Sequence, residues 1–242
     1  MFARNRKKRG STELLKPPFP LTLPLEFRRS ARARRISLRL DRARGRVILV
    51  APHSLARRHA LDFLARHEGW INARLAQLPA DRPFVDGATV PILGIPHFIH
   101  GDSSQLRGLV TRDGNVLTVP GAPEHLPRRL SDFLKREARR EIGIRARAKA
   151  ARISRPVTAL TLRDPKSRWG SCNSAGRLGF SWRLIIAPEF VLDYVVAHEV
   201  AHLAEMNHGT AFWKLCAELT DSDLKTARAW LKRHGPELHR YG

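Results

Sequence analysis

The sequence predicts an α+β fold, in which strands and helices occur in separate runs along the 242 residues. Residues 35–50 alternate polar and apolar side chains on both sides of a turn, which is typical of a β-hairpin. Residues 90–119 form a second strand-rich run, which indicates a small meander. Residues 127–153 instead place apolar side chains on one helical face and many arginines on the other.

Changes in composition divide the chain into three parts. Residues 1–25 predict a flexible tail, because they combine a basic cluster with prolines that exclude regular structure. Residues 26–122 predict a smaller α/β N-terminal half with the hairpin, a helix over residues 54–78 and the meander. Prolines and a glycine at residues 120–123 mark a boundary, so residues 123–242 are expected to form the second half.

The second half begins with the long helix and continues with strands. We expect a strand over residues 157–162 and a long strand over residues 176–186. The next helix should start at Pro188, because a missing N–H costs nothing in the first turn. The last helix is expected to be capped by Asp221 or Ser222.

The helix that follows the long strand carries the sequence His-Glu-Val-Ala-His. Histidines four apart project from one helical face, so the imidazoles of His198 and His202 can reach a single ion. Glu199 is turned by about 100° from the first of them, so it can approach the ion without being a ligand. His208 follows where the helix should end, and a turn there would bring it back toward the ion.

A zinc ion would explain this set of side chains. Catalytic zinc takes three protein ligands and keeps a fourth position open, and imidazole nitrogens suit it. Zinc lowers the pKa of bound water to about 7, and Glu199 could then take the proton. The alternative is an amphipathic core helix with two surface histidines. The apolar residues on both sides of the motif argue against it, because buried polar groups need partners. We therefore expect one zinc ion per chain.

The sequence also resembles a known family. The stretch from His198 to Trp213 resembles the signature of the YgjP-like metallopeptidases, in which HExxH is followed by an Asn-His pair and an aromatic residue. The stretch from Ser167 to Pro188 carries a second signature of that family. The resemblance covers nearly everything from about residue 28 to the C-terminus. SprT-like and WLM proteases are more distant relatives through the same helix motif.

This resemblance implies a fold and a set of roles. The fold is a zincin-like metalloprotease core, with the active-site helix beside a mixed or antiparallel sheet. Glu199 would be the catalytic residue. The implied metal ligands are His198, His202 and His208. In zincins an edge strand beside the site pairs with an extended substrate through backbone hydrogen bonds. The residues expected on this rim are Trp169, Gly170 and Ser171, or the strand after them.

Further polar side chains are candidates to orient the ligands or to stabilise an oxyanion. Glu205 and Asp193 could each accept a hydrogen bond from the second nitrogen of a ligand histidine. Tyr194 lies four residues before the first motif histidine and could donate to an oxyanion, although such a tyrosine is as often a core residue. Arg168 and Arg183 are alternative electrophilic groups, and the sequence does not choose among them.

Charge is the most unusual feature of the composition. The chain has 44 Lys and Arg against 22 Asp and Glu, a formal net charge of +22. Such a surface attracts nucleic acid, anionic lipid or acidic substrates. A solvated, arginine-rich surface is the alternative, because arginine and alanine are abundant whereas lysine is scarce. Nucleic acid is therefore a candidate partner beside a polypeptide substrate.

The remaining composition indicates a cytoplasmic protein without a membrane partner. Cys172 and Cys216 provide no disulfide framework, which favours a reducing compartment, and we expect the first to be an inert thiol. We find no pattern of a signal peptide or of a transmembrane helix. His97 and His100 lie three apart in an expected strand and point to opposite faces, so we interpret both as structural. The oligomeric state is not indicated.

The leading hypothesis is a zinc-dependent metallopeptidase, most simply an endopeptidase, in which zinc-bound water activated by Glu199 hydrolyses peptide bonds. One alternative is a metal-dependent phosphoanhydride or nucleotide hydrolase, for which a positive surface would concentrate polyanions. Another is a DNA-associated protease, as the resemblance to SprT-like and WLM proteases implies. A nucleic-acid-binding module with a structural zinc would need a closed fourth position, which three histidines do not supply.

Overall fold

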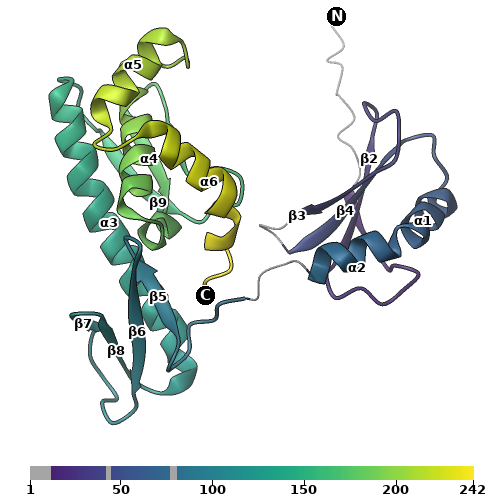
Figure 1. Cartoon of the computed structure of the whole chain (residues 1–242), viewed down its shortest axis with the longest axis horizontal. Coiled ribbons are helices and arrows are strands. Elements are labelled where there is room, and N and C mark those ends of the chain that lie inside the picture. Colours follow the sequence, from purple (N-terminus) through teal and green to yellow (C-terminus); the bar gives the residue numbers. More distant parts are fainter. Residues whose placement is uncertain (1–11, 42–44, 77–80) are drawn as a thin grey trace, which may run out of the picture. The chain divides into compact units, whose positions relative to one another are not determined.

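The computed structural model of the chain describes residues 12–41, 45–76 and 81–242. The chain forms two compact units, Met1–Pro79 and Ala80–Gly242 (Figure 1). Each unit has a hydrophobic core of its own. Helices and sheets occur in separate segments, so the predicted α+β class is confirmed. No helix in the described part of the chain is long and apolar enough to cross a bilayer.

The first unit is a sheet with two helices. Its elements are β1 (Thr12–Leu15), β2 (Leu25–Ser30), β3 (Ser37–Asp41), β4 (Arg46–Pro52), α1 (Arg57–Arg66) and α2 (Glu68–Ala76). The strand order is β1-β2-β4-β3, in which β2 and β4 are parallel and the other neighbours antiparallel. The predicted hairpin is confirmed as β3 and β4. Leu49 and Leu64 are fully buried, so β4 and α1 pack their apolar faces into one core.

Two expectations for this unit differ from the structure. Residues 12–15 belong to a strand although they fall within the predicted tail, and the basic cluster of residues 4–9 lies outside the described residues. The helix predicted over residues 54–78 is two helices, which are separated at His67. The ring of His67 stacks on Phe63 at 4.0 Å, and its Nδ1 donates to the Phe63 carbonyl oxygen. This side chain therefore satisfies a carbonyl at the end of α1 and stabilises the break.

The second unit contains two sheets and the longer helices. Its elements are β5 (Thr89–Ile92), β6 (Ile95–Asp102), β7 (Thr111–Asp113), β8 (Val116–Pro120), η1 (Pro123–His125), α3 (Leu126–Arg152), β9 (Ala159–Arg163), β10 (Gly170–Cys172), β11 (Arg177–Ser181), η2 (Trp182–Ile186), α4 (Glu189–Ala201), α5 (Thr210–Leu219) and α6 (Leu224–Leu238). One sheet has the order β5-β6-β8-β7 and the other β10-β11-β9. Both are mixed, because β6 is parallel to β8 and β11 is parallel to β9.

The boundary between the units lies before residue 80, and not at residues 120–123 as predicted. The reason is that the sheet of β5 to β8 has no core of its own. Val90 and Ile99 of this sheet are buried in one cluster with Leu130 of α3 and Val191 of α4. A short sheet with one apolar face is stable only against another element, and here that element is α3.

Helix α4 lies in the middle of the second unit, in contact with α3, α5 and α6 (Figure 1). Its side chains are buried nearly all round, as expected for a central helix. The start of the helix is also held by a buried ion pair. Lys149 of α3 lies 2.7 Å from Asp193 of α4 and 2.9 Å from Asp221, and it donates to the Leu219 carbonyl oxygen at 2.6 Å. One ammonium group therefore links α3, α4 and the segment between α5 and α6.

Three element boundaries in the second unit differ from the predictions. The strand expected over residues 176–186 ends at Ser181, where η2 begins and the Ser181 hydroxyl accepts a hydrogen bond from the Arg183 N–H. Helix α6 is capped by Asp223, since Asp221 is bound to Lys149 instead. Helix α4 ends at Ala201, earlier than expected. The first two of these boundaries depend on side-chain hydrogen bonds, which hydrophobic periodicity does not reveal.

Candidate metal centre

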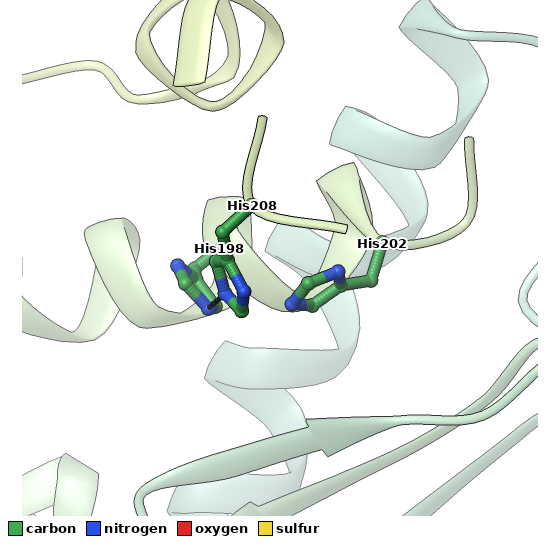
Figure 2. A group of neighbouring side chains, drawn as sticks. All are labelled: His198, His202 and His208. Carbon is green, nitrogen blue, oxygen red and sulfur yellow. Dashed lines mark hydrogen bonds between the residues drawn. The ribbon is translucent and has the colours of Figure 1, made fainter. Parts of the chain in front are cut away.

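The three predicted histidines meet at one point (Figure 2). His198 lies in the last turn of α4, His202 is its C-terminal cap, and His208 comes from the loop before α5. One ring nitrogen from each lies within 4.8 Å of the other two. His198 Nε2 and His208 Nε2 are 3.1 Å apart. The early end of α4 makes this possible, because the chain turns at residues 202–204 and brings the third imidazole back to the helix.

A backbone carbonyl orients the second histidine. His202 Nδ1 lies 3.0 Å from the carbonyl oxygen of Glu205. A carbonyl oxygen only accepts, so Nδ1 carries the proton and Nε2 is left with its lone pair for a metal. The side chain of Glu205 was one of two candidate acceptors, whereas the structure uses its main chain.

The first histidine lies deepest in the site. Its Nδ1 is buried without a hydrogen-bond partner among the described residues, and its Nε2 faces the other two imidazoles. Burial lowers the pKa of His198 to about 4, and the neighbouring imidazoles add to the effect. Burial also lowers the pKa of His202. Both rings are therefore neutral at neutral pH, which is the form that binds metal ions.

These nitrogens fit a zinc ion. Zn–N bonds of about 2.0–2.1 Å at tetrahedral angles place two ligand nitrogens about 3.3 Å apart. The separation of 3.1 Å between the Nε2 atoms of His198 and His208 is close to that value. Without a metal ion between them, two neutral imidazole nitrogens at this distance could share at most one hydrogen bond. Three imidazoles leave the fourth position of a tetrahedral ion open, as in catalytic zinc sites.

Two aromatic residues of α5 support the three rings. The ring of Phe212 is 4.9 Å from His198, 4.5 Å from His202 and 4.6 Å from His208, measured between centroids. Phe212 is fully buried, so it forms the floor on which the imidazoles pack. The Trp213 ring lies 5.9 Å from His198 and 5.6 Å from His208. The three imidazoles therefore pack on an apolar base, which restricts the orientations of their rings.

Glu199 is held against a glycine. A Cβ on Gly170 would lie 2.5 Å from Cγ and 2.6 Å from Cδ of Glu199, and closer still to Oε1. Only a residue without a side chain fits there. Glu199 is 6% exposed, and burial raises the pKa of its carboxyl group to about 7, although nearby Arg168 acts to lower this pKa. A carboxyl with a pKa near neutrality can both accept and release a proton at physiological pH.

The predicted rim is the edge strand β10, which packs against α4. Gly170 and Ser171 lie on it, and Trp169 directly precedes it. Within the described sheet, β10 pairs only with β11, so its outer edge is open for a further strand. Trp169 stacks on His239 at 5.0 Å and packs against Gly235 of α6. These contacts anchor the start of the strand beside Glu199.

Cavities flank the three histidines along this strand. A cavity of about 260 Å³ is lined by Arg168, Trp169, Gly170, Tyr194, Val195, His198, Glu199 and Leu231. A second cavity, of about 290 Å³, lies at His202 and the turn that follows β10, from Asn173 to Gly176. A chain that paired with β10 would therefore run from the first cavity to the second and pass the histidines.

Only some of the candidate residues for orienting the histidines or stabilising an oxyanion lie near Glu199 in the structure. Arg168 and Tyr194 line the cavity with Glu199, and burial raises the pKa of Tyr194 to about 12, so its hydroxyl keeps its proton. Arg183 instead binds Asp164 at 2.7 Å and the carbonyl oxygens of residues 238 and 241. Asp193 is paired with Lys149. Neither Arg183 nor Asp193 reaches the three histidines, and both hold elements together instead.

The other histidines and the cysteines stay outside the metal centre. His97 is buried and donates through Nδ1 to the Ile95 carbonyl oxygen, whereas His100 on the same strand is exposed, so the two point to opposite faces as predicted. Both cysteines are free, and burial raises the pKa of each thiol to about 11, so both are protonated at neutral pH. Cys172 is thus a weak nucleophile.

One cation near the site was not predicted. Arg228 of α6 lies over the Trp213 ring, with its Cζ 4.6 Å from the ring centroid. It shares the lining of a cavity with Tyr194. No sequence signal distinguishes Arg228 from the other 43 lysines and arginines, because its position depends on how α6 packs against α4.

Comparison with known proteins identifies the family. The sequence matches the YgjP-like metallopeptidase domain over residues 34–234, which is most of the chain. Comparisons with curated proteins and with solved structures find no match. The matched region contains the helix with HExxH, the third histidine and the edge strand beside them. A metallopeptidase requires a metal ion, and the cluster of three imidazoles offers a place to hold it. The chain therefore belongs to the YgjP-like metallopeptidase family.

Proposed function

We propose that the chain is a zinc-dependent endopeptidase with His198, His202 and His208 as metal ligands and Glu199 as the catalytic base. The observation that carries this proposal is the open edge of β10 beside Glu199. An edge strand binds an extended polypeptide through main-chain hydrogen bonds and demands no particular sequence. A cavity at each end of the strand can hold the side chains of such a substrate.

In this proposal each residue of the site has its own role in peptide hydrolysis. Zinc, when bound, supplies Lewis acidity that acidifies water and polarises a carbonyl. The Glu199 carboxylate takes a proton from the attacking water and returns it to the leaving amine. Its fixed position against Gly170 keeps it close to the histidines. Tyr194 and Arg168 line the same cavity and are the groups that can donate to the developing oxyanion.

The test is Glu199→Gln. The amide has nearly the same shape but cannot accept the proton, so hydrolysis of an unfolded protein such as casein should fall by at least about a hundredfold. The zinc content should remain one per chain, because Glu199 is not a ligand. The matched control is Glu205→Gln, since only the main chain of Glu205 contacts a ligand histidine. Unchanged casein hydrolysis in Glu199→Gln would refute the proposed base. Hydrolysis of nucleoside triphosphates in place of casein would indicate a phosphoanhydride hydrolase.

A nucleic-acid-associated form of the peptidase is the second candidate. It is favoured by a cavity of about 560 Å³ between α3 and β9, whose lining includes the cations Lys135, Arg136, Arg139 and Arg163. Several cations around one hollow attract phosphate groups. Fluorescence anisotropy with labelled DNA at two salt concentrations tests this form, because phosphate contacts weaken steeply as salt increases.

A further inference from the structure

A third cavity continues the active-site cleft on the Glu199 side. It has a volume of about 500 Å³ and is lined by Tyr194, Lys225, Arg228, Ala229, Leu231 and Lys232. Tyr194 and Leu231 also line the cavity that contains His198 and Glu199. The two cavities are therefore adjacent, and we refer to them together as the α6 cleft.

The α6 cleft is strongly positive. Its charged lining consists of the cations Arg168, Lys225, Arg228 and Lys232 and of one carboxyl group, that of the proposed base. Arg228 and Lys232 are exposed and make no ion pair within the described residues. The cations in the cleft are thus free to bind an anion.

Arg228 is also fixed in place relative to the metal centre. Its guanidinium lies over Trp213, and this indole is itself within 5.9 Å of the His198 ring and 5.6 Å of the His208 ring. A single aromatic ring therefore separates the guanidinium from the metal ligands. A stacked arginine loses less conformational freedom when it binds a ligand, which makes it an effective recognition residue.

We propose that the α6 cleft binds a carboxylate of the polypeptide substrate next to the scissile bond, with Arg228 as the main specificity residue and Lys232 as its helper. This inference rests on the proposed peptidase function. Guanidinium groups bind carboxylates through two parallel hydrogen bonds, which adds geometric selectivity to the charge. A substrate strand on β10 would lie beside the first of the two cavities at Gly170, and the shared residues Tyr194 and Leu231 lead from there to these cations. The carboxylate is either an Asp or Glu side chain or the C-terminal group of a peptide.

The experiment is a cleavage assay on a peptide library with the zinc-loaded full-length protein, with products identified by mass spectrometry. Half of the library carries amidated C-termini and half free acids, which separates the two sources of carboxylate. We expect cleavage beside Asp or Glu to exceed cleavage beside Asn or Gln by about tenfold in kcat/KM, as is typical of one charge-assisted hydrogen bond. If instead free-acid peptides are cleaved near their C-terminus about tenfold better than amidated ones, whatever the neighbouring side chain, the C-terminal group is the ligand.

The variants test which residue carries the preference. Arg228→Glu should abolish the preference, measured as the ratio of kcat/KM for acidic peptides to kcat/KM for neutral ones, whereas Arg228→Lys should retain part of it. Lys232→Glu should weaken the preference without disturbing the stacking on Trp213. The matched control is Arg233→Glu, which makes the same charge change at an exposed position of α6 that lines neither cavity.

The outcomes separate this inference from the proposed function. Cleavage by the wild type with no preference for an acidic side chain or for a free C-terminus, or a preference that Arg228→Glu does not alter, overturns the carboxylate site and leaves the peptidase intact. No cleavage by the wild type, or equal cleavage by Glu199→Gln, overturns both. An unchanged peptide preference together with an oligonucleotide affinity that Arg228→Glu removes would assign the cleft to nucleic acid and overturn the inference.

Discussion

The contact between Gly170 and Glu199 makes a sharp prediction for Gly170→Ala. The added methyl would lie 2.5 Å from Cγ of Glu199, whereas ordinary contacts begin at 3.4 Å. The difference, 3.4 − 2.5 = 0.9 Å, is the distance by which the side chain or the strand must move. Misplacing a catalytic group by about 1 Å costs on the order of a hundredfold in rate. We expect kcat for peptide hydrolysis to fall by about this factor.

The assay should distinguish this displacement from loss of the metal or of the fold. Zinc content is expected to remain one per chain, because the three ligands lie on α4 and on the loop after it. The control is Gly209→Ala, which is next to His208 but whose added Cβ would meet nothing within 4 Å. Glu199→Asp supplies a second control, since the shorter side chain relieves the clash.

The combination of these changes tests the contact directly. Glu199→Asp alone should lower kcat, but in the Gly170→Ala background it should cost much less, because the methyl group has already displaced the longer carboxylate. Purely additive effects, or wild-type activity in Gly170→Ala, would refute the reasoning that the glycine positions the base.

Two further predictions concern stability. Lys149→Met should lower the free energy of unfolding by about 3–5 kcal/mol in urea titration, because it leaves the buried Asp193 carboxylate without its partner. Lys135→Met, which breaks an exposed pair with Asp132, should cost less than about 0.5 kcal/mol. Burial would raise the pKa of Asp164, but Arg183 outweighs it and lowers that pKa below 3.8. The pair therefore stabilises the fold above pH 3.8 and loses this effect as pH falls through the lower folded-state pKa. Asp164→Asn should thus destabilise at pH 7, and its difference from wild type should shrink at acidic pH; a constant difference would contradict this.

The sequence predicted the grouping of the three histidines better than it predicted the segments around them. Helix pitch is a local property, so the spacing of His198 and His202 was sufficient to place both imidazoles on one side. The return of His208 was expected from a turn, and the structure provides that turn earlier than predicted. The unit boundary was wrong for a corresponding reason. Strand patterns show that a sheet exists, but they do not show which helix covers it.

The local sequence around each arginine did not show what that arginine does in the folded structure. Arg168 and Arg183 were equal candidates in the sequence, yet Arg168 lines the cavity with Glu199, whereas Arg183 binds Asp164 and two carbonyl oxygens. Arg228 was not considered, although it stacks on an aromatic residue of the site. A charged side chain acquires its partner from elements distant in the sequence, so its role is visible only after packing.

The sequence by itself determined the α+β class, the family signature, the three imidazoles and the carboxyl group beside them, because each depends on residue type and short spacing. Only the tertiary structure decided that a glycine on an edge strand fixes Glu199, that a main-chain carbonyl orients His202 and that cations of α6 line the cleft. These features join segments that lie far apart along the chain, and their geometry follows from how helices and strands pack rather than from any local pattern.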